Sequence, residues 1–91
     1  MEQRRENRFK PNQLATVTVL GFRPGPVLQA CIVDLSGSGM RLRSNVPVPC
    51  GTHVAIAVEG LSAQGSVCRC EPLGDDAYEF AVEELESAPK I

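Results

Sequence analysis

Short runs of β-prone residues, separated by breaks rich in glycine, proline and asparagine, recur along almost the whole chain. In the run at 14–20, apolar residues alternate with Thr16 and Thr18, so the apolar side chains share one face of a strand. Few segments have the period of a helix. Strands are therefore expected at 14–20, 27–35, 40–43, 53–58, 61–70 and 78–82.

A chain of 91 residues is enough for one compact domain. Short strands without helices favour an antiparallel sheet, which in so small a chain closes into a barrel and thereby hides its edges. The expected fold is all-β, a six-stranded antiparallel barrel filled by the apolar faces, with little or no C-terminal helix. We expect a flexible N-terminal arm at 1–13, the barrel at 14–84, and a tail at 85–91 that is ragged or a single helical turn.

Charge is unevenly distributed along the chain. The net charge is −2, but residues 1–45 carry +4 and residues 46–91 carry −6. This asymmetry indicates a local site for an anion rather than a basic surface for nucleic acid. No apolar run approaches the ~20 residues that a membrane helix needs. Residues 1–10 lack the apolar region of a secretory signal, so a cytoplasmic protein is expected.

Three arginines, Arg4, Arg5 and Arg8, form the first candidate cluster, in the polar segment before the first expected strand. The guanidinium group offers a planar fork of donors that matches phosphate oxygens in pairs, and its flat face stacks on aromatic rings. On a flexible lead-in, these side chains could wrap around an anionic ligand. The alternative interpretation is a solvated, frayed chain terminus.

The second candidate cluster is Asp34, Ser36 and Gly39, at the end of the second expected strand. Asp34 and Ser36 are two residues apart and therefore project from one face of the strand. A carboxylate beside a hydroxyl can accept the N–H groups of a guanine edge and bond a neighbouring phosphate or amide. Gly39 permits a close backbone approach or a positive φ. The alternative is a hairpin turn in which Asp and Ser cap their own backbone.

In this order and at this separation, Arg4-x-x-x-Arg8 and Asp34-x-Ser36-x-x-Gly39 resemble the two-part signature of the PilZ domain. PilZ domains are bacterial receptors for the second messenger cyclic di-GMP. The resemblance extends to the hairpin at 34–42, to the strand at 51–56 and to the glycine of 65–67, and it spans roughly residues 4 to 84. It implies a PilZ-like split barrel.

The resemblance also implies roles for the two clusters. Arg4 and Arg8 would hold phosphates and stack on guanine, with Arg5 assisting. Asp34 and Ser36 would read a guanine edge, and Gly39 would let the base lie close. The arm would fold over the ligand, often an intercalated dimer in this family, and the changed surface would regulate a partner protein.

Two alternatives to a cyclic di-GMP receptor stay open. The chain could instead be a PilZ-like barrel that does not bind the nucleotide and acts as a protein-interaction scaffold. A small barrel could also bind single-stranded nucleic acid, but the acidic C-terminal half and the scarcity of aromatic residues disfavour this interpretation. In none of these readings is the protein an enzyme, and none requires a cofactor.

Three positions near the expected site stay open or depart from the family pattern. Ala81 stands where a glycine is usual and would narrow the base pocket, and Glu84 stands where an aromatic residue is usual. Arg41 shares a strand face with Gly39, and it either extends the anion site or is simply solvated.

The cysteines and the single histidine invite metal or hydrolase chemistry, which we regard as unsupported. Cys68 and Cys70, one residue apart on a strand, are expected on one face and lack the spacing of a zinc site. Together with Cys31 and Cys50, they are expected as reduced thiols. His53 and Ser36 lack the sequence frame of a hydrolase nucleophile.

Overall fold

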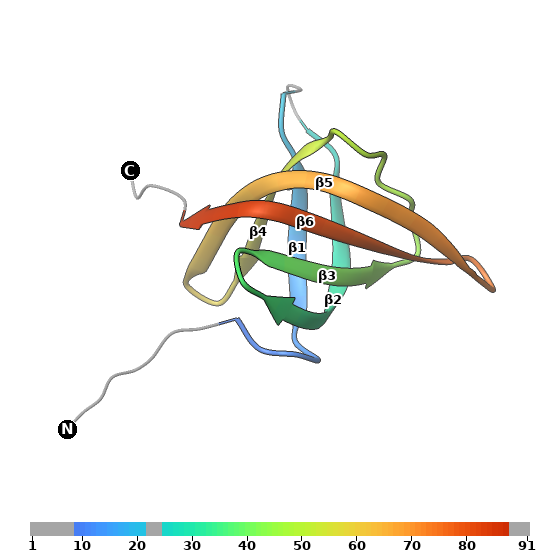
Figure 1. Ribbon diagram of the computed structural model, residues 1–91, viewed down its shortest axis with the longest axis horizontal. Helices are drawn as coiled ribbons and strands as arrows, with labels where there is room; N and C mark the ends of the chain where they lie inside the picture. Colours follow the sequence, from blue (N-terminus) through green and yellow to red (C-terminus); the bar gives the residue numbers. More distant parts are fainter. Residues whose placement is uncertain (1–8, 22–24, 88–91) are drawn as a thin grey trace.

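The computed structural model describes residues 9–21 and 25–87, which contain six β-strands and no helix, and hence no helix that could cross a membrane. The strands are β1 (Leu14–Val19), β2 (Val27–Ser36), β3 (Gly39–Ser44), β4 (His53–Val58), β5 (Leu61–Gly74) and β6 (Ala77–Ser87). Neighbouring strands are antiparallel, and the sheet closes in the order β1-β2-β3-β6-β5-β4 (Figure 1). The expected six-stranded antiparallel barrel is confirmed. Residues 1–8 of the expected arm lie outside the described residues.

Closure gives every strand a partner on both sides. β1, for example, pairs with β2 on one side and with β4 on the other, so that Val17 lies opposite both Leu28 and Ile56. At the far side of the barrel, β6 connects β3 to β5. Most of the strand pairing is therefore contained within the barrel, although past Val67 the pairings of β5 in the described part of the chain are with β6 alone.

Alternate residues of each strand point inward and form the core. Ile32, Leu42, Ile56 and Phe80 are completely buried, and a side chain of this kind contributes about 1.5–3 kcal/mol on burial. The rest of the core consists of small and β-branched residues and one methionine: Ala15, Val17, Ala30, Met40, Val48, Val54, Val58, Ala63, Val67 and Val82. The intervening residues, with the opposite parity, form the outer surface on which the candidate site lies.

The hairpin between β5 and β6 is longer than the sequence predicts. β5 continues to Gly74, and the turn contains only Asp75 and Asp76, whose φ angles are 54° and 60°. Positive φ at both central residues is the geometry of a two-residue hairpin turn. Pro72 is tolerated within the strand because the pairing register shifts between Pro72 and Gly74.

The end of β6 also differs from the expectation of a short tail after residue 84. β6 continues to Ser87, because an extra residue, Glu84, is accommodated as a bulge opposite β5. Glu84 has a φ of 62°, and the bulge returns Leu85 to a position packed against the core. A simple alternating pattern does not extend through such a bulge, so the sequence underestimates the strand.

A second bulge changes the orientation of the Cys68–Cys70 pair. Val67 lies opposite Val82 and Arg69 opposite Ala81, which leaves Cys68 as the extra residue on β5. Cys68 is therefore exposed, whereas Cys70 packs against the core. The expectation that both thiols share one face is wrong, because it assumed an uninterrupted strand.

Candidate functional site

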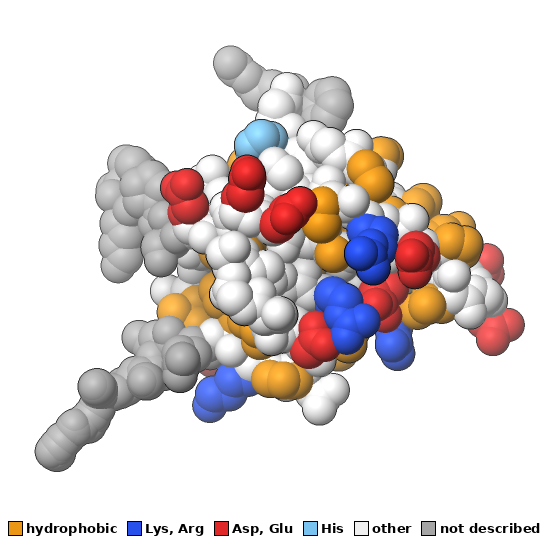
Figure 2. Space-filling model, viewed as in Figure 1, with side chains coloured by type: hydrophobic (Ala, Val, Ile, Leu, Met, Phe, Trp, Pro, Cys, Tyr) orange, Lys and Arg blue, Asp and Glu red, His pale blue; other side chains and the backbone are white. Residues whose placement is uncertain are grey.

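A hollow of about 380 Å³ lies on the outside of the barrel where β2, β3, β5 and β6 run beside one another. Figure 2 shows basic and acidic side chains gathered on the face that β3, β5 and β6 present to the viewer. The hollow is lined by Asp34, Ser36, Gly39, Met40, Arg41, Cys68, Ala81, Val82 and Glu83. The structure thus brings the second candidate cluster together in one place and adds Arg41 and residues of β5 and β6 to it.

The two ends of the β2–β3 hairpin position Asp34, Ser36 and Gly39. A two-residue turn places Ser36 opposite Gly39 and Asp34 opposite Arg41. Gly39 has no positive φ; that conformation belongs to Gly37, with φ 56°. A Cβ at Gly39 would instead lie 3.2 Å from the carbonyl oxygen of Val82. Of the two reasons for a glycine at 39, the structure therefore supports the close backbone approach.

Four charged side chains form a network across the outer face of three strands. Arg41 donates from Nε to Oδ1 of Asp34 at 2.9 Å and from Nη2 to Oδ2 of the same carboxylate. Its Nη1 donates to Oε2 of Glu79 at 3.0 Å. Nη2 of Arg43 lies 3.6 Å from Oε1 of Glu79. The guanidinium of Arg41 is thus held between an acid on β2 and an acid on β6.

These contacts keep both Asp34 and Arg41 charged. The hydrogen bonds from Arg41 hold the pKa of Asp34 below its ordinary value, and the same contact raises the pKa of Arg41. The two side chains are 43% and 48% exposed, so solvent screens their attraction and the pair adds little to stability. The site therefore offers an ionised carboxylate at neutral pH whose two oxygen atoms already accept hydrogen bonds.

Four residues of β5 and β6 complete the hollow: Cys68, Ala81, Val82 and Glu83. Ala81 is one of the lining residues. Cys68 and Glu83 were missed by the sequence analysis, because only the bulge turns Cys68 outward on this side. Desolvation is the main cause that raises the pKa of the Cys68 thiol, and contact with Glu83 is the second. The raised pKa makes this thiol a weaker nucleophile at neutral pH.

Arg4, Arg5 and Arg8 lie outside the described residues. The stretch directly after them is tied to the barrel: Phe9 packs against the core. The amide of Asn12 donates to the carbonyl oxygen of Ile32 at 2.7 Å. In return, the amide of Ile32 donates to the carbonyl oxygen of Gln13 at 2.9 Å. Ile32 precedes Asp34 by two residues, so the chain that follows the arginines runs beside the part of β2 that carries the candidate site.

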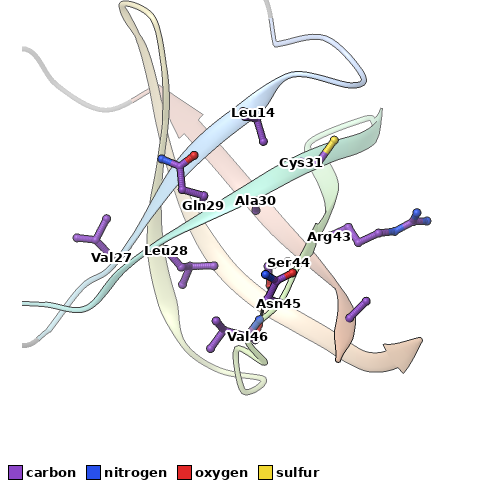
Figure 3. Close-up of a pocket in the computed structure, with 11 residues that line it drawn as sticks. Leu14, Val27, Leu28, Gln29, Ala30, Cys31, Arg43, Ser44, Asn45 and Val46 are labelled. Carbon is purple, nitrogen blue, oxygen red and sulfur yellow. Dashed lines mark hydrogen bonds between the residues drawn. The ribbon is translucent and has the colours of Figure 1, made fainter. Parts of the chain in front are cut away.

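A separate, larger hollow of about 560 Å³ lies over β1, β2 and β3 (Figure 3). Its lining is mainly apolar, and Leu14 and Val27 are 66% and 62% exposed. Among the described residues that line this hollow, Arg43 is the one that is charged, and none is a carboxylate. The described lining therefore lacks the carboxylate–hydroxyl pair of the candidate cluster.

His53 lines a different hollow from that of the candidate cluster. Nε2 of His53 lies 3.5 Å from Oγ of Ser66, and both residues line a small hollow that does not contain Ser36. Within 9–21 and 25–87, no group of three or more His, Cys, Asp or Glu side chains is arranged to hold a metal ion.

The chain matches the family model of the PilZ domain over residues 2–89. The match includes both candidate clusters and all six strands. It confirms the resemblance that the arginine and Asp-x-Ser-x-x-Gly motifs indicated. No curated protein and no solved structure matches the chain.

Proposed function

Since the chain belongs to the PilZ domain family, a family of cyclic di-GMP receptors, we propose that it binds cyclic di-GMP at the hollow between β2, β3, β5 and β6. The observation that supports this proposal best is the convergence of Asp34, Ser36 and Gly39 on that hollow.

The chemistry of the hollow suits a guanine base. An ionised carboxylate provides two acceptor oxygens, and a guanine edge presents two parallel donors, N1–H and N2–H. The Ser36 hydroxyl can bond a neighbouring phosphate or amide, and the missing side chain of Gly39 leaves room for the base. Guanine would therefore lie against β2 and β3, with Ala81 and Cys68 opposite it.

We assign the phosphates to Arg4 and Arg8, which match the family signature, and the adjacent Arg5 would assist. The anchoring of residues 9–13 supports this assignment, because Phe9 and the hydrogen bonds to Ile32 tie the chain beside β2. In the sequence, Arg8 directly precedes Phe9, the first residue of this anchor. On binding, the arginines would close over the nucleotide and change the surface that the barrel offers to a partner protein.

The protein would thus act as a receptor or adaptor, as PilZ domains do, and not as an enzyme. Its ligand would be its only small-molecule requirement, and its output would be the regulation of an effector protein. The competing proposal is a PilZ barrel that does not bind the nucleotide and acts as a scaffold.

Calorimetric titration of the whole chain with cyclic di-GMP tests the proposal. We expect micromolar or tighter binding that is lost in Arg8→Ala and in Asp34→Ala. Lys10→Ala is the matched control for Arg8→Ala, because it removes a positive charge two residues away on an exposed side chain. No heat at about 100 μM ligand, an affinity weaker than about −5.5 kcal/mol, would favour the scaffold.

Alkylation of cysteines locates the ligand independently of these variants. Cys68 lines the hollow, so bound nucleotide should slow its reaction with iodoacetamide, whereas exposed Cys50, outside the hollow, should react at an unchanged rate. Peptide mass spectrometry reads both sites in one sample. Binding that leaves Cys68 unprotected would place the ligand elsewhere on the barrel.

A further inference from the structure

Arg41 already uses both oxygens of the carboxylate that the proposed function assigns to guanine. We infer that Arg41 is a gate on the nucleotide site: it pairs with Asp34 when the site is empty, and it must release Asp34 before a guanine edge can bind. The inference rests on the proposed function and adds a competitor that is part of the chain itself.

The competition follows from the matching donor patterns. The Nε–H and Nη2–H groups of Arg41 reach Oδ1 and Oδ2 of Asp34 side by side. The N1–H and N2–H groups of guanine form the same kind of two-donor edge. Two such edges cannot occupy the same in-plane side of one carboxylate, so occupancy by Arg41 and by guanine is mutually exclusive there.

Glu79 gives the gate a second position. It accepts a hydrogen bond from Nη1 of Arg41, and this contact does not depend on Asp34. Glu79 is only 19% exposed and belongs to β6, whereas Asp34 belongs to β2. When Asp34 is released, Arg41 can therefore keep an acidic partner over β3 and β6, which lowers the cost of opening.

The effect of the gate on affinity should be moderate. Arg41 and Asp34 are both about half exposed, and exposed ion pairs are weak. Removing the competitor should therefore tighten nucleotide binding by about two- to fivefold. Loss of a positive charge near an anionic ligand acts in the opposite direction, so the comparison needs a charge-matched variant.

Arg41→Gln and Arg43→Gln form that matched pair. Both remove one positive charge from the same face of β3, and both side chains contact Glu79, but only Arg41 contacts Asp34. We expect Arg41→Gln to bind cyclic di-GMP about two- to fivefold more tightly than Arg43→Gln in calorimetric titration at one salt concentration. Arg41→Lys, which keeps the charge but lacks the fork, should fall between wild type and Arg41→Gln.

The outcomes separate the gate from the function on which it rests. Equal affinities of Arg41→Gln and Arg43→Gln, or weaker binding by Arg41→Gln, would overturn the gate while leaving the receptor intact. Weaker binding would make Arg41 a direct ligand contact. No binding by wild type or by any variant would overturn the receptor proposal and the gate with it.

Discussion

The protonation of one side chain, Asp34, connects the charge network to pH. The hydrogen bonds from Arg41 hold the pKa of Asp34 below its ordinary value of 3.8. Because the pKa is lower in the folded protein than in the unfolded chain, the ion pair stabilises the fold fully above the unfolded value. This contribution is lost as the pH falls through the lowered pKa. We expect Arg41→Gln to raise the pKa of Asp34, which NMR titration of its carboxyl carbon would measure.

Arg43→Gln again serves as the control, because Arg43 pairs with Glu79 and makes no hydrogen bond to Asp34. It should leave the Asp34 titration nearly unchanged. The ion pair would be shown to be absent in solution if both variants titrated like wild type at Asp34. This measurement needs no nucleotide, so it tests the network separately from its proposed ligand.

Individual residues of the site differed in how far the sequence predicted them. Asp34 and Ser36 could be grouped because a two-residue spacing places both on one strand face. The pairing of Asp34 with Arg41 depends on register, which follows once the turn is known to contain only Gly37 and Ser38. Cys68 could not be predicted, because its direction depends on a bulge that leaves no pattern in the residues around it.

At the scale of the element, Gly65 is the residue that lets β5 and β6 approach. Gly65 is buried, and a Cβ there would lie 2.6 Å from the carbonyl oxygen of Glu83 and 2.7 Å from Cγ1 of Val82. We expect Gly65→Ala to lower the free energy of unfolding by about 1–3 kcal/mol, the usual cost of overpacking. Urea denaturation would measure this change.

Ser62→Ala on the same strand provides the comparison. Ser62 is exposed, so its substitution should change the free energy of unfolding by no more than about 0.5 kcal/mol. If the two variants were equally stable, the close approach at Gly65 would have to relax without cost. That result would contradict the tight packing of β5 on β6 beside the hollow.

The strands themselves were predictable wherever apolar and polar residues alternate without interruption. β1 is of this kind, and in β4 large apolar residues alternate with His53 and two alanines; the expected bounds of both strands agree with the structure to within one residue. β5 and β6 extend beyond their expected ends because register shifts at Pro72 and Glu84 break the alternation while pairing continues. The position of a bulge depends on the pairing with the partner strand, so it cannot be predicted from the residues of one strand alone.

At the scale of the whole molecule, closure makes the site inseparable from the fold. The hollow takes its lining from β2, β3, β5 and β6, and each of these strands is paired on both sides. No lining strand can leave without opening the barrel, so a nucleotide in the hollow should bind the folded state and not the unfolded chain. At a free ligand concentration of 100 times Kd, the free energy of unfolding should rise by about 2.7 kcal/mol.

For a domain of this size, that increase raises the melting midpoint by about 10–20 °C. Circular dichroism melts over a series of cyclic di-GMP concentrations would measure it, with GMP at equal concentration and Asp34→Ala as controls that should show little shift. If calorimetry showed that the protein binds cyclic di-GMP but the melting midpoint did not move, the ligand would not be bound by the folded barrel. The site would then have to lie within the N-terminal arm, and the hollow would have no part in recognition.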